Sequence, residues 1–154
     1  MAFFVDSSAA VKYYVTEAGS TWVRQLVDGT ALVFLAEITL AEVAAALSIL
    51  QRLQRLGLRH RREIWERFDR DCTERYHLIP VPYNVVYSAA LLCARHPLKA
   101  YDAVQLAAGL ALRRGLDEQG ALMTFVSSDD TLLTAAQAEG LTVENPLRHT
   151  ALDS

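Results

Sequence analysis

The chain is predicted to be an α/β protein with a mainly parallel sheet held between helical layers. Short apolar runs of β-favouring residues alternate with helical segments, which is the order expected when each parallel strand is followed by a helical crossover. At 154 residues, with 52% apolar and 21% charged residues, the chain is long enough to bury one core and does not have the composition of a disordered protein. We therefore expect a single domain over residues 1–146 and a short polar C-terminal tail over residues 147–154.

The N-terminal segments predict two strands separated by two helices. The apolar run at residues 2–5 reads as a first strand because polar residues stop it at once, and a helix follows over residues 9–14. A second helix is expected over residues 19–29, where glycines stand at both ends. A second strand is expected over residues 31–35.

The middle of the chain predicts two long helices and a third strand. A helix from Thr39 to about Gly57 is indicated by apolar residues that recur at every third or fourth position. A charged helix is expected at about residues 60–75. The third strand, over residues 77–81, is halted by Pro82.

The C-terminal half repeats the alternation of helices and strands. The elements expected are a helix over residues 84–95, a helix over residues 99–114, a strand over residues 123–126, a helix ending at residue 139 and a short strand over residues 141–143. Pro97 separates the first two helices, and Gly115 is expected to end the second. The whole pattern predicts a central sheet of four or five strands.

The charge balance limits the classes of partner. The formal net charge of −3 argues against a surface adapted as a whole to polyanions. Arginine far outnumbers lysine, however, and one short stretch free of acids contains Arg52, Arg55, Arg59, Arg61 and Arg62. Because guanidinium groups make bidentate contacts with phosphate, this stretch is the best candidate for binding a nucleic acid. A solvated helix face, or a contact with an acidic partner, is an equal alternative.

The cysteines and the apolar runs predict a cytoplasmic protein. Cys72 and Cys93 lack the spacing of metal ligands and read as small apolar residues in a reducing compartment. The N-terminal apolar run lacks the features of a secretory signal, and no run approaches the roughly twenty residues of a membrane span. No association with a membrane is expected.

Four acidic residues lie where a strand ends or a helix begins: Asp6, Glu42, Asp102 and Asp129. Because ligands gather at the carboxyl ends of parallel strands, acids at those ends can converge. Converging carboxylates repel one another unless a cation lies between them, so the pattern predicts a site for a divalent metal. We expect Asp6 and Asp102 to be the principal ligands. Glu42 and Asp129 would bind a second ion or hold a water molecule.

Each acid also has a structural explanation. Asp6 could cap the first helix. The run Thr39-Leu40-Ala41-Glu42 matches a capping box, in which the glutamate bonds back to the cap residue. Asp129 and Asp130 compete for the cap of the last helix, and Asp129 lies nearer the end of the strand. Asp102, in the first turn of a helix rich in alanine and leucine, is the hardest to explain as a cap.

Four blocks of sequence contain or adjoin these acids. They are Phe4-Val5-Asp6-Ser7-Ser8-Ala9-Ala10-Val11-Lys12-Tyr13-Tyr14, Leu40-Ala41-Glu42-Val43, Ala100-Tyr101-Asp102-Ala103-Val104-Gln105-Leu106-Ala107 and Val126-Ser127-Ser128-Asp129. In this order and at these separations they resemble the PIN-domain family, most closely the VapC-type toxins of bacterial and archaeal toxin–antitoxin pairs. The first and third blocks are the most specific. Gln105 departs from the pattern, because many relatives have histidine there.

The resemblance implies a three-layer α/β/α domain with an acidic pocket that holds Mg²⁺ or Mn²⁺. It further implies an endoribonuclease that hydrolyses RNA phosphodiester bonds, is inhibited by a cognate antitoxin and forms a homodimer. The residues that match the family's acidic positions are Asp6, Glu42, Asp102 and Asp129, and those that match its accessory hydroxyl positions are Ser8 and Ser127. The alternative is a non-catalytic PIN-like module that binds RNA or protein.

Overall fold

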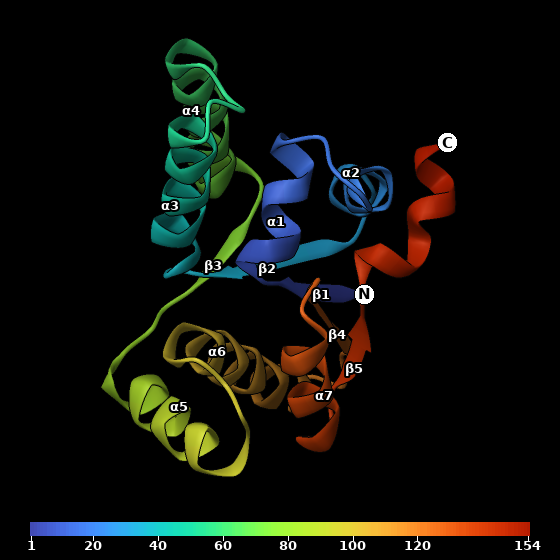
Figure 1. Cartoon of the computed structure of the whole chain (residues 1–154). Coiled ribbons are helices and arrows are strands. Elements are labelled where there is room, and N and C mark those ends of the chain that lie inside the picture. The colour runs from blue at the N-terminus through green and yellow to red at the C-terminus, as the bar shows by residue number, and fades with distance from the viewer.

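The computed structural model describes residues 1–154 and contains one five-stranded sheet in the order β3-β2-β1-β4-β5 (Figure 1). The strands are β1 (Ala2–Val5), β2 (Leu32–Ala36), β3 (His77–Ile79), β4 (Met123–Val126) and β5 (Thr142–Glu144). Every neighbouring pair is parallel. The predicted α/β class and parallel sheet are confirmed, and β1 is the central strand.

Seven α-helices and a C-terminal 3-10 helix surround the sheet. They are α1 (Ser7–Tyr14), α2 (Ser20–Asp28), α3 (Thr39–Arg52), α4 (Leu58–Glu74), α5 (Tyr83–Arg95), α6 (Ala100–Asp117), α7 (Asp130–Ala138) and η1 (Pro146–Asp153). Helices α1 to α4 lie on one side of the sheet and α5 to α7 on the other, which confirms the three-layer arrangement (Figure 1). None of these helices combines the length and the apolar character needed to cross a bilayer.

Both faces of the central part of the sheet are buried, which is why β1, β2 and β4 read as mainly apolar runs. Phe4 points toward α5, α6 and α7 and stacks on Phe125 of the neighbouring strand, with 5.2 Å between ring centroids. Val5 points to the opposite face and packs with the helices there, because side chains alternate along a strand. A Cβ atom added to Gly109 of α6 would lie 2.8 Å from the Phe125 ring, so this glycine allows α6 to pack closely on the sheet.

Two helices end at residues other than those predicted. Helix α3 ends at Arg52 rather than near Gly57, because Gln54 adopts the left-handed conformation (φ 58°) that commonly closes a helix. Helix α6 passes through Gly115, its predicted end, and continues to Asp117. A glycine inside a helix costs only about 1 kcal/mol, which the packing of α6 outweighs.

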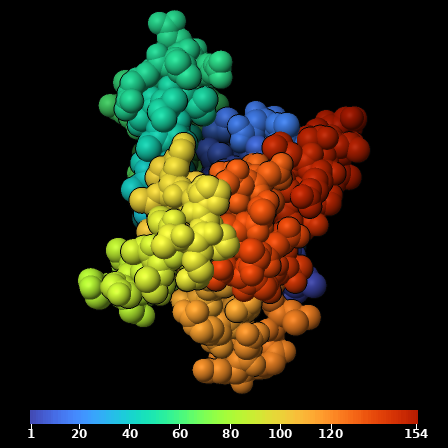
Figure 2. All heavy atoms as spheres, turned by 60° about the horizontal axis from the view of Figure 1, so that its bottom comes forward, coloured from blue at the N-terminus to red at the C-terminus, as the bar shows by residue number.

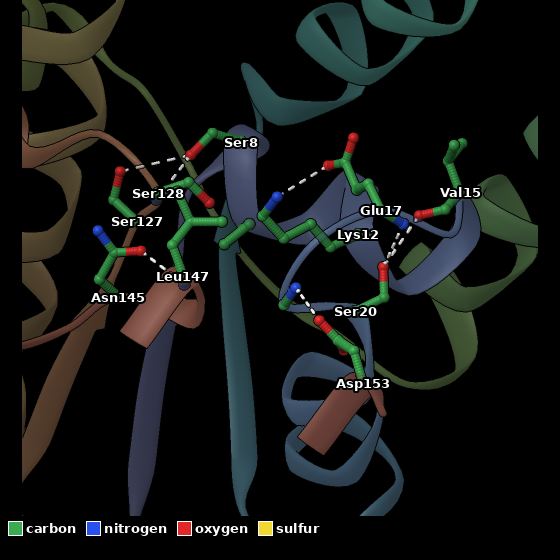
Figure 3. A network of polar contacts seen from close by, with 12 residues as sticks. Ser8, Lys12, Val15, Glu17, Ser20, Ser127, Ser128, Asn145, Leu147 and Asp153 are labelled. Carbon is green, nitrogen blue, oxygen red and sulfur yellow. Dashed lines mark hydrogen bonds and ion pairs between the residues drawn. The ribbon is translucent and has the colours of Figure 1, made fainter. Parts of the chain in front are cut away.

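The residues expected to form a short polar tail form most of η1. Asp153 accepts hydrogen bonds from the backbone nitrogens of Gly19 (2.8 Å) and Thr21 (3.1 Å) at the start of α2. The cap residue of α2, Gly19, has no side chain that could accept these bonds. Figure 3 shows Asp153 turned toward this helix terminus. The ring of His149 stacks on Trp22 with 4.8 Å between centroids. The polar residues of this segment therefore dock it on α2.

Candidate active site

The crossover helices change sides of the sheet between β1 and β4. The chain passes from β1 to β3 through helices on one face and from β3 to β5 through helices on the other (Figure 1). In open α/β sheets a ligand binds beyond the carboxyl ends of the strands at the point where the strand order reverses. Asp6 directly follows β1, and Ser127 directly follows β4, its hydrogen-bonded neighbour. The topology therefore marks this edge as the candidate site.

Asp6 lies at the centre of this edge and is only 3% exposed. Its Oδ1 accepts hydrogen bonds from Ser8 Oγ (2.7 Å) and from the backbone nitrogen of Ala9 (3.0 Å), and its Oδ2 accepts one from Ser127 Oγ (2.6 Å). Ser8 Oγ also accepts a bond from the backbone nitrogen of Ser128 at 3.0 Å, and Figure 3 shows these serines meeting from the two strand ends. Asp6 is thus the cap of α1, as one interpretation predicts, and also joins the ends of β1 and β4.

The carboxyl group of Asp6 is strongly perturbed. Burial raises its pKa from 3.8 to about 6, the bonds from Ser127, Ser8 and Ala9 oppose this effect, and the negative charge of Glu42 adds to it. The three hydrogen bonds therefore compensate the buried charge only in part. A bound cation would complete the compensation.

Glu42 does not form the capping box. The residue that precedes α3 is Ile38, which provides no side-chain cap, and Thr39 is already helical. Instead, Oε2 of Glu42 accepts a hydrogen bond from Ser7 Oγ at 2.9 Å, and Oε1 accepts one from Gln105 Nε2 at 2.7 Å. The carboxylate is therefore bound by two other helices at the end of β1. The sequence identifies Gln105 only as a departure from the family pattern and does not reveal this contact.

Asp102 connects the acids electrostatically. It lies half-buried in the first turn of α6, and no hydrogen bond to its carboxylate affects its pKa. Its pKa is raised to about 6, first by burial and then by the negative charges of Asp129 and Glu42, while Lys99 acts in the opposite direction. Together with the effect of Glu42 on Asp6, these influences indicate that the four predicted acids lie near one another at this edge of the sheet.

Asp129, rather than Asp130, belongs to this set. Asp129 caps α7, because its Oδ1 accepts bonds from two backbone N–H groups of the first turn at 2.9 and 3.3 Å. Asp130 is exposed, and its Oδ1 accepts a bond from Asn145 Nδ2 at 3.0 Å. Of the two charges, only that of Asp129 acts on Asp102. The structure therefore favours Asp129 as the fourth acid.

The candidate donors are of the type that a hard divalent cation prefers, but they do not form a complete coordination site in this conformation. All the candidate donors are oxygen atoms, which Mg²⁺ and Mn²⁺ prefer. Asp6 and Asp102 have raised pKa values, first through burial and then through the negative charges of Glu42 and, for Asp102, Asp129, and a cation would relieve these effects. No three side chains of aspartate, glutamate, histidine or cysteine lie close enough together to hold one ion. Binding would therefore require the side chains to turn toward the ion.

The arginine stretch lies away from these acids. Arg52, Arg55, Arg59 and Arg62 are exposed and stand where α3 turns into α4, at the tip of a helical hairpin that projects from the body (Figure 2). Ten residues separate Glu42 from Arg52 along one helix, which corresponds to about 15 Å at 1.5 Å per residue. Arg59 pairs only with Glu63 on its own helix, at 3.3 Å. Any role of these arginines in binding is thus at a distance of about 15 Å or more along the helix from Glu42.

The largest cavity also lies apart from the acids. It has a volume of about 590 Å³ and is lined by residues of β2, β3, α5 and α6 without one ionisable side chain. Leu32 and Gly115 among its lining residues belong to the amino end of β2 and the C-terminal part of α6. The cavity is unsuited to acid–base or metal chemistry.

Comparison with known proteins places the fold in a family. The family model described as the PIN domain matches residues 3–137. A search of curated proteins found no match.

Solved structures share this architecture at low sequence identity. The crystal structure of FitAcB from Neisseria gonorrhoeae is 18% identical, with a TM-score of 0.68 over 94% of this chain and 97% of that one. Mycobacterium tuberculosis VapC20, described as a sarcin-ricin loop cleaving toxin, is 18% identical, with a TM-score of 0.61 over 91% and 96%. A toxin–antitoxin complex from Klebsiella pneumoniae is 16% identical, with a TM-score of 0.59 over 95% and 98%. At such identities the likeness establishes the fold alone.

Proposed function

Since the chain belongs to the PIN domain family, we propose that it is a metal-dependent endoribonuclease toxin of the VapC type, held inactive by a cognate antitoxin. The observation that carries this proposal is the convergence of Asp6, Glu42, Asp102 and Asp129 at the switch point of the sheet. None of the four acids forms a salt bridge, so their mutual repulsion is unfavourable for the fold, and a bound cation would offset it.

Asp6 and Asp102 are the residues proposed to hold Mg²⁺ or Mn²⁺. Asp6 is fixed by three hydrogen bonds, whereas no hydrogen bond holds the Asp102 carboxylate. A bound divalent ion would supply charge neutralisation at the scissile phosphate and a more acidic water. Glu42 and Asp129 stand on either side and would bind a second ion or orient the attacking water. The cap bonds of Asp129 use only Oδ1, so Oδ2 is available to accept a proton from that water.

Binding of RNA must overcome the negative charge of the site. The arginines at the tip of the α3–α4 hairpin are proposed to contact phosphates of the substrate beyond the cleavage point. For single-stranded nucleic acid, each such contact contributes about 0.7 to the slope of log K against log salt concentration. Replacing Arg52, Arg55, Arg59 and Arg62 by glutamine should therefore flatten this slope in a filter-binding titration. An unchanged slope would assign the arginines to a protein partner or to solvent.

A homodimer is also proposed, and helix α5 offers the surface for it. Its inner face packs on α6, but its outer face presents Tyr83 (80% exposed), Val86, Tyr87 and Leu91 to solvent. A helix that is apolar on both faces normally has both faces covered. The only charged side chain of α5, Arg95, is paired with Glu139, so the outer face is uncharged and suits contact with its own copy. Light scattering should show a dimer that Tyr87→Glu converts to monomer; equal masses would refute this interface.

Cleavage of RNA by the purified protein tests the catalytic proposal. Wild-type protein should cleave RNA with Mn²⁺ and lose this activity with a chelator. Asp6→Asn and Asp102→Asn should each abolish cleavage, while the matched control Asp130→Asn should retain it, since Asp130 is exposed and outside the site. Unchanged cleavage in both site variants would show that the site assignment is wrong. RNA binding without any cleavage by the wild type would favour the non-catalytic module.

Growth of cells that express the chain tests the toxin assignment. Expression without an antitoxin should arrest growth, and expression of Asp6→Asn should not. Equal growth with wild type and empty vector would contradict the toxin assignment.

A further inference from the structure

A glutamine is buried beside the acidic site. Gln105 of α6 is 1% exposed, and its amide nitrogen donates hydrogen bonds to Glu42 Oε1 at 2.7 Å and to Thr39 Oγ1 at 2.9 Å. The bond to the carboxylate is charge-assisted and therefore stronger than one between neutral groups. Gln105 thus links α6 to the first turn of α3.

The contacts determine the orientation of the amide. With the amide reversed, Oε1 of Gln105 would face the Glu42 carboxylate, and two acceptors would oppose each other. In the observed orientation, Oε1 of Gln105 is buried without a hydrogen-bond partner. A buried acceptor without a partner lowers the stability of the protein. The observed orientation therefore keeps the hydrogen bond to Glu42 at the cost of leaving the amide oxygen of Gln105 without one.

Ser7 completes the contacts of the Glu42 carboxylate. Ser7 Oγ donates to Oε2 at 2.9 Å, while Gln105 binds Oε1, so each carboxylate oxygen is fixed by a different helix. Helices α1 and α3 lie on one face of the sheet and α6 on the other. The bonds to Glu42 therefore connect the two helical layers at the point where the strand order reverses. A carboxylate has about four acceptor positions, and two remain available to a ligand or a water molecule.

We propose that Gln105, with Ser7, is a positioning residue that holds the Glu42 carboxylate in the acidic site. The effect of this positioning on catalysis rests on the proposed nuclease function. The position of the Glu42 side chain, however, can be measured whether or not the protein is a nuclease. Neither residue needs to touch the substrate or the ion. Their role is to keep a charged side chain, attached to a half-exposed helix, from turning to solvent.

The first test uses the metal-free protein. Crystal structures of wild type and of the Ser7→Ala/Gln105→Met double variant should show Glu42 in one rotamer in the wild type and in several, or turned outward, in the variant. Methionine retains the volume of glutamine and removes only its hydrogen bonds. Glu42 in an unchanged single position in the double variant would overturn the inference, whatever the outcome of any activity assay.

The second test measures Mn²⁺ affinity by calorimetry. Gln105→Met should weaken binding of the second ion, which Glu42 would hold, by roughly 10- to 100-fold, the effect expected from the loss of one hydrogen bond to a charged group. Thr39→Val is the matched control, because it removes the other acceptor of the same amide and leaves the bond to Glu42. Thr39→Val should lower the melting temperature about as much as Gln105→Met does, but it should reduce the Mn²⁺ affinity much less.

A double-mutant cycle decides whether Gln105 acts through Glu42. In a Glu42→Ala background, Gln105→Met should cause little further loss of Mn²⁺ affinity. A loss as large as that in the wild-type background would show that Gln105 acts on the site by another route. If the wild type binds no Mn²⁺ and cleaves no RNA, the proposed function fails, and the rotamer of Glu42 in the first test still decides the positioning role.

Discussion

Replacing Asp6 by asparagine should stabilise the protein at neutral pH while removing its proposed activity. The side chain is 3% exposed, and burial is the main cause of its raised pKa. At 1.36 kcal/mol per pKa unit, the difference between 3.8 and about 6 corresponds to about 3 kcal/mol of unfavourable free energy for the ionised form. An asparagine of the same shape carries no such charge.

The hydrogen bonds around Asp6 can accommodate the amide. Its oxygen would keep the bonds from Ser8 Oγ and the backbone nitrogen of Ala9. Its nitrogen would face Ser127 Oγ, now 2.6 Å from Oδ2, and this hydroxyl would change from donor to acceptor. A bond from nitrogen is longer than this by a few tenths of an ångström, so a small shift is needed. We therefore expect a net gain of about 1 to 3 kcal/mol.

The gain should depend on pH in a defined direction. Because the pKa of Asp6 is raised in the folded state, its contribution to stability is fully present below 3.8 and is lost as the pH rises through about 6. The asparagine variant lacks this loss. Its advantage over the wild type should be near zero or negative at pH 4, grow between pH 4 and pH 6, and remain constant above pH 7.

Urea denaturation in a metal-free buffer at several pH values measures this difference. A gain of 1 to 3 kcal/mol corresponds to a rise in melting temperature of about 2 to 10 °C for a chain of this size. Addition of Mn²⁺ should stabilise the wild type more than the variant, because only the wild type retains the proposed ligand. An asparagine variant less stable than wild type at pH 8, or a difference independent of pH, would refute the assignment of burial as the dominant effect.

Two further predictions concern the site and the packing behind it. Asp129→Asn should lower the pKa of Asp102 below about 6, because the negative charge of Asp129 raises it, and a carboxyl ¹³C NMR titration that showed no decrease would contradict their proximity. Gly109→Ala should destabilise the protein by about 1 to 3 kcal/mol, since the added Cβ would lie 2.8 Å from Phe125. Gly115→Ala on the same helix is the control: its Cβ meets nothing within 4 Å, so this substitution should stabilise the protein by about 0.5 to 1 kcal/mol. Calorimetry measures both differences.

Local patterns in the sequence predict most of the elements and all four acids. Strands β1, β2 and β4 are short apolar runs ended by polar residues, and each acid lies at the end of such a strand or at the start of a helix. The resemblance to the PIN family adds the three-layer order, which the sheet and its helices confirm. The roles of the acids stay predictions, although the structure brings them together.

Contacts between distant residues could not be predicted. The capping-box interpretation of Glu42 fails because its partners, Ser7 and Gln105, lie 35 and 63 residues away in the sequence. The choice between Asp129 and Asp130 depends on which carboxylate faces α6, which differs between adjacent positions of one turn. The sequence favours Asp129 only because it lies nearer the end of the strand, and it contains no information about the partners of Glu42.

The fold class is predicted from the sequence alone, because apolar strands and helix periodicities reflect burial on both faces of a parallel sheet. The sequence also determined which acids stand at strand ends and helix starts. Three features became visible only in the folded chain: α1, α3 and α6 meet around Glu42, η1 docks on α2, and the arginines stand at the tip of a hairpin. Periodicity depends on local hydrogen bonding and burial, whereas contacts between distant helices depend on strand order and on how the helices cross the sheet.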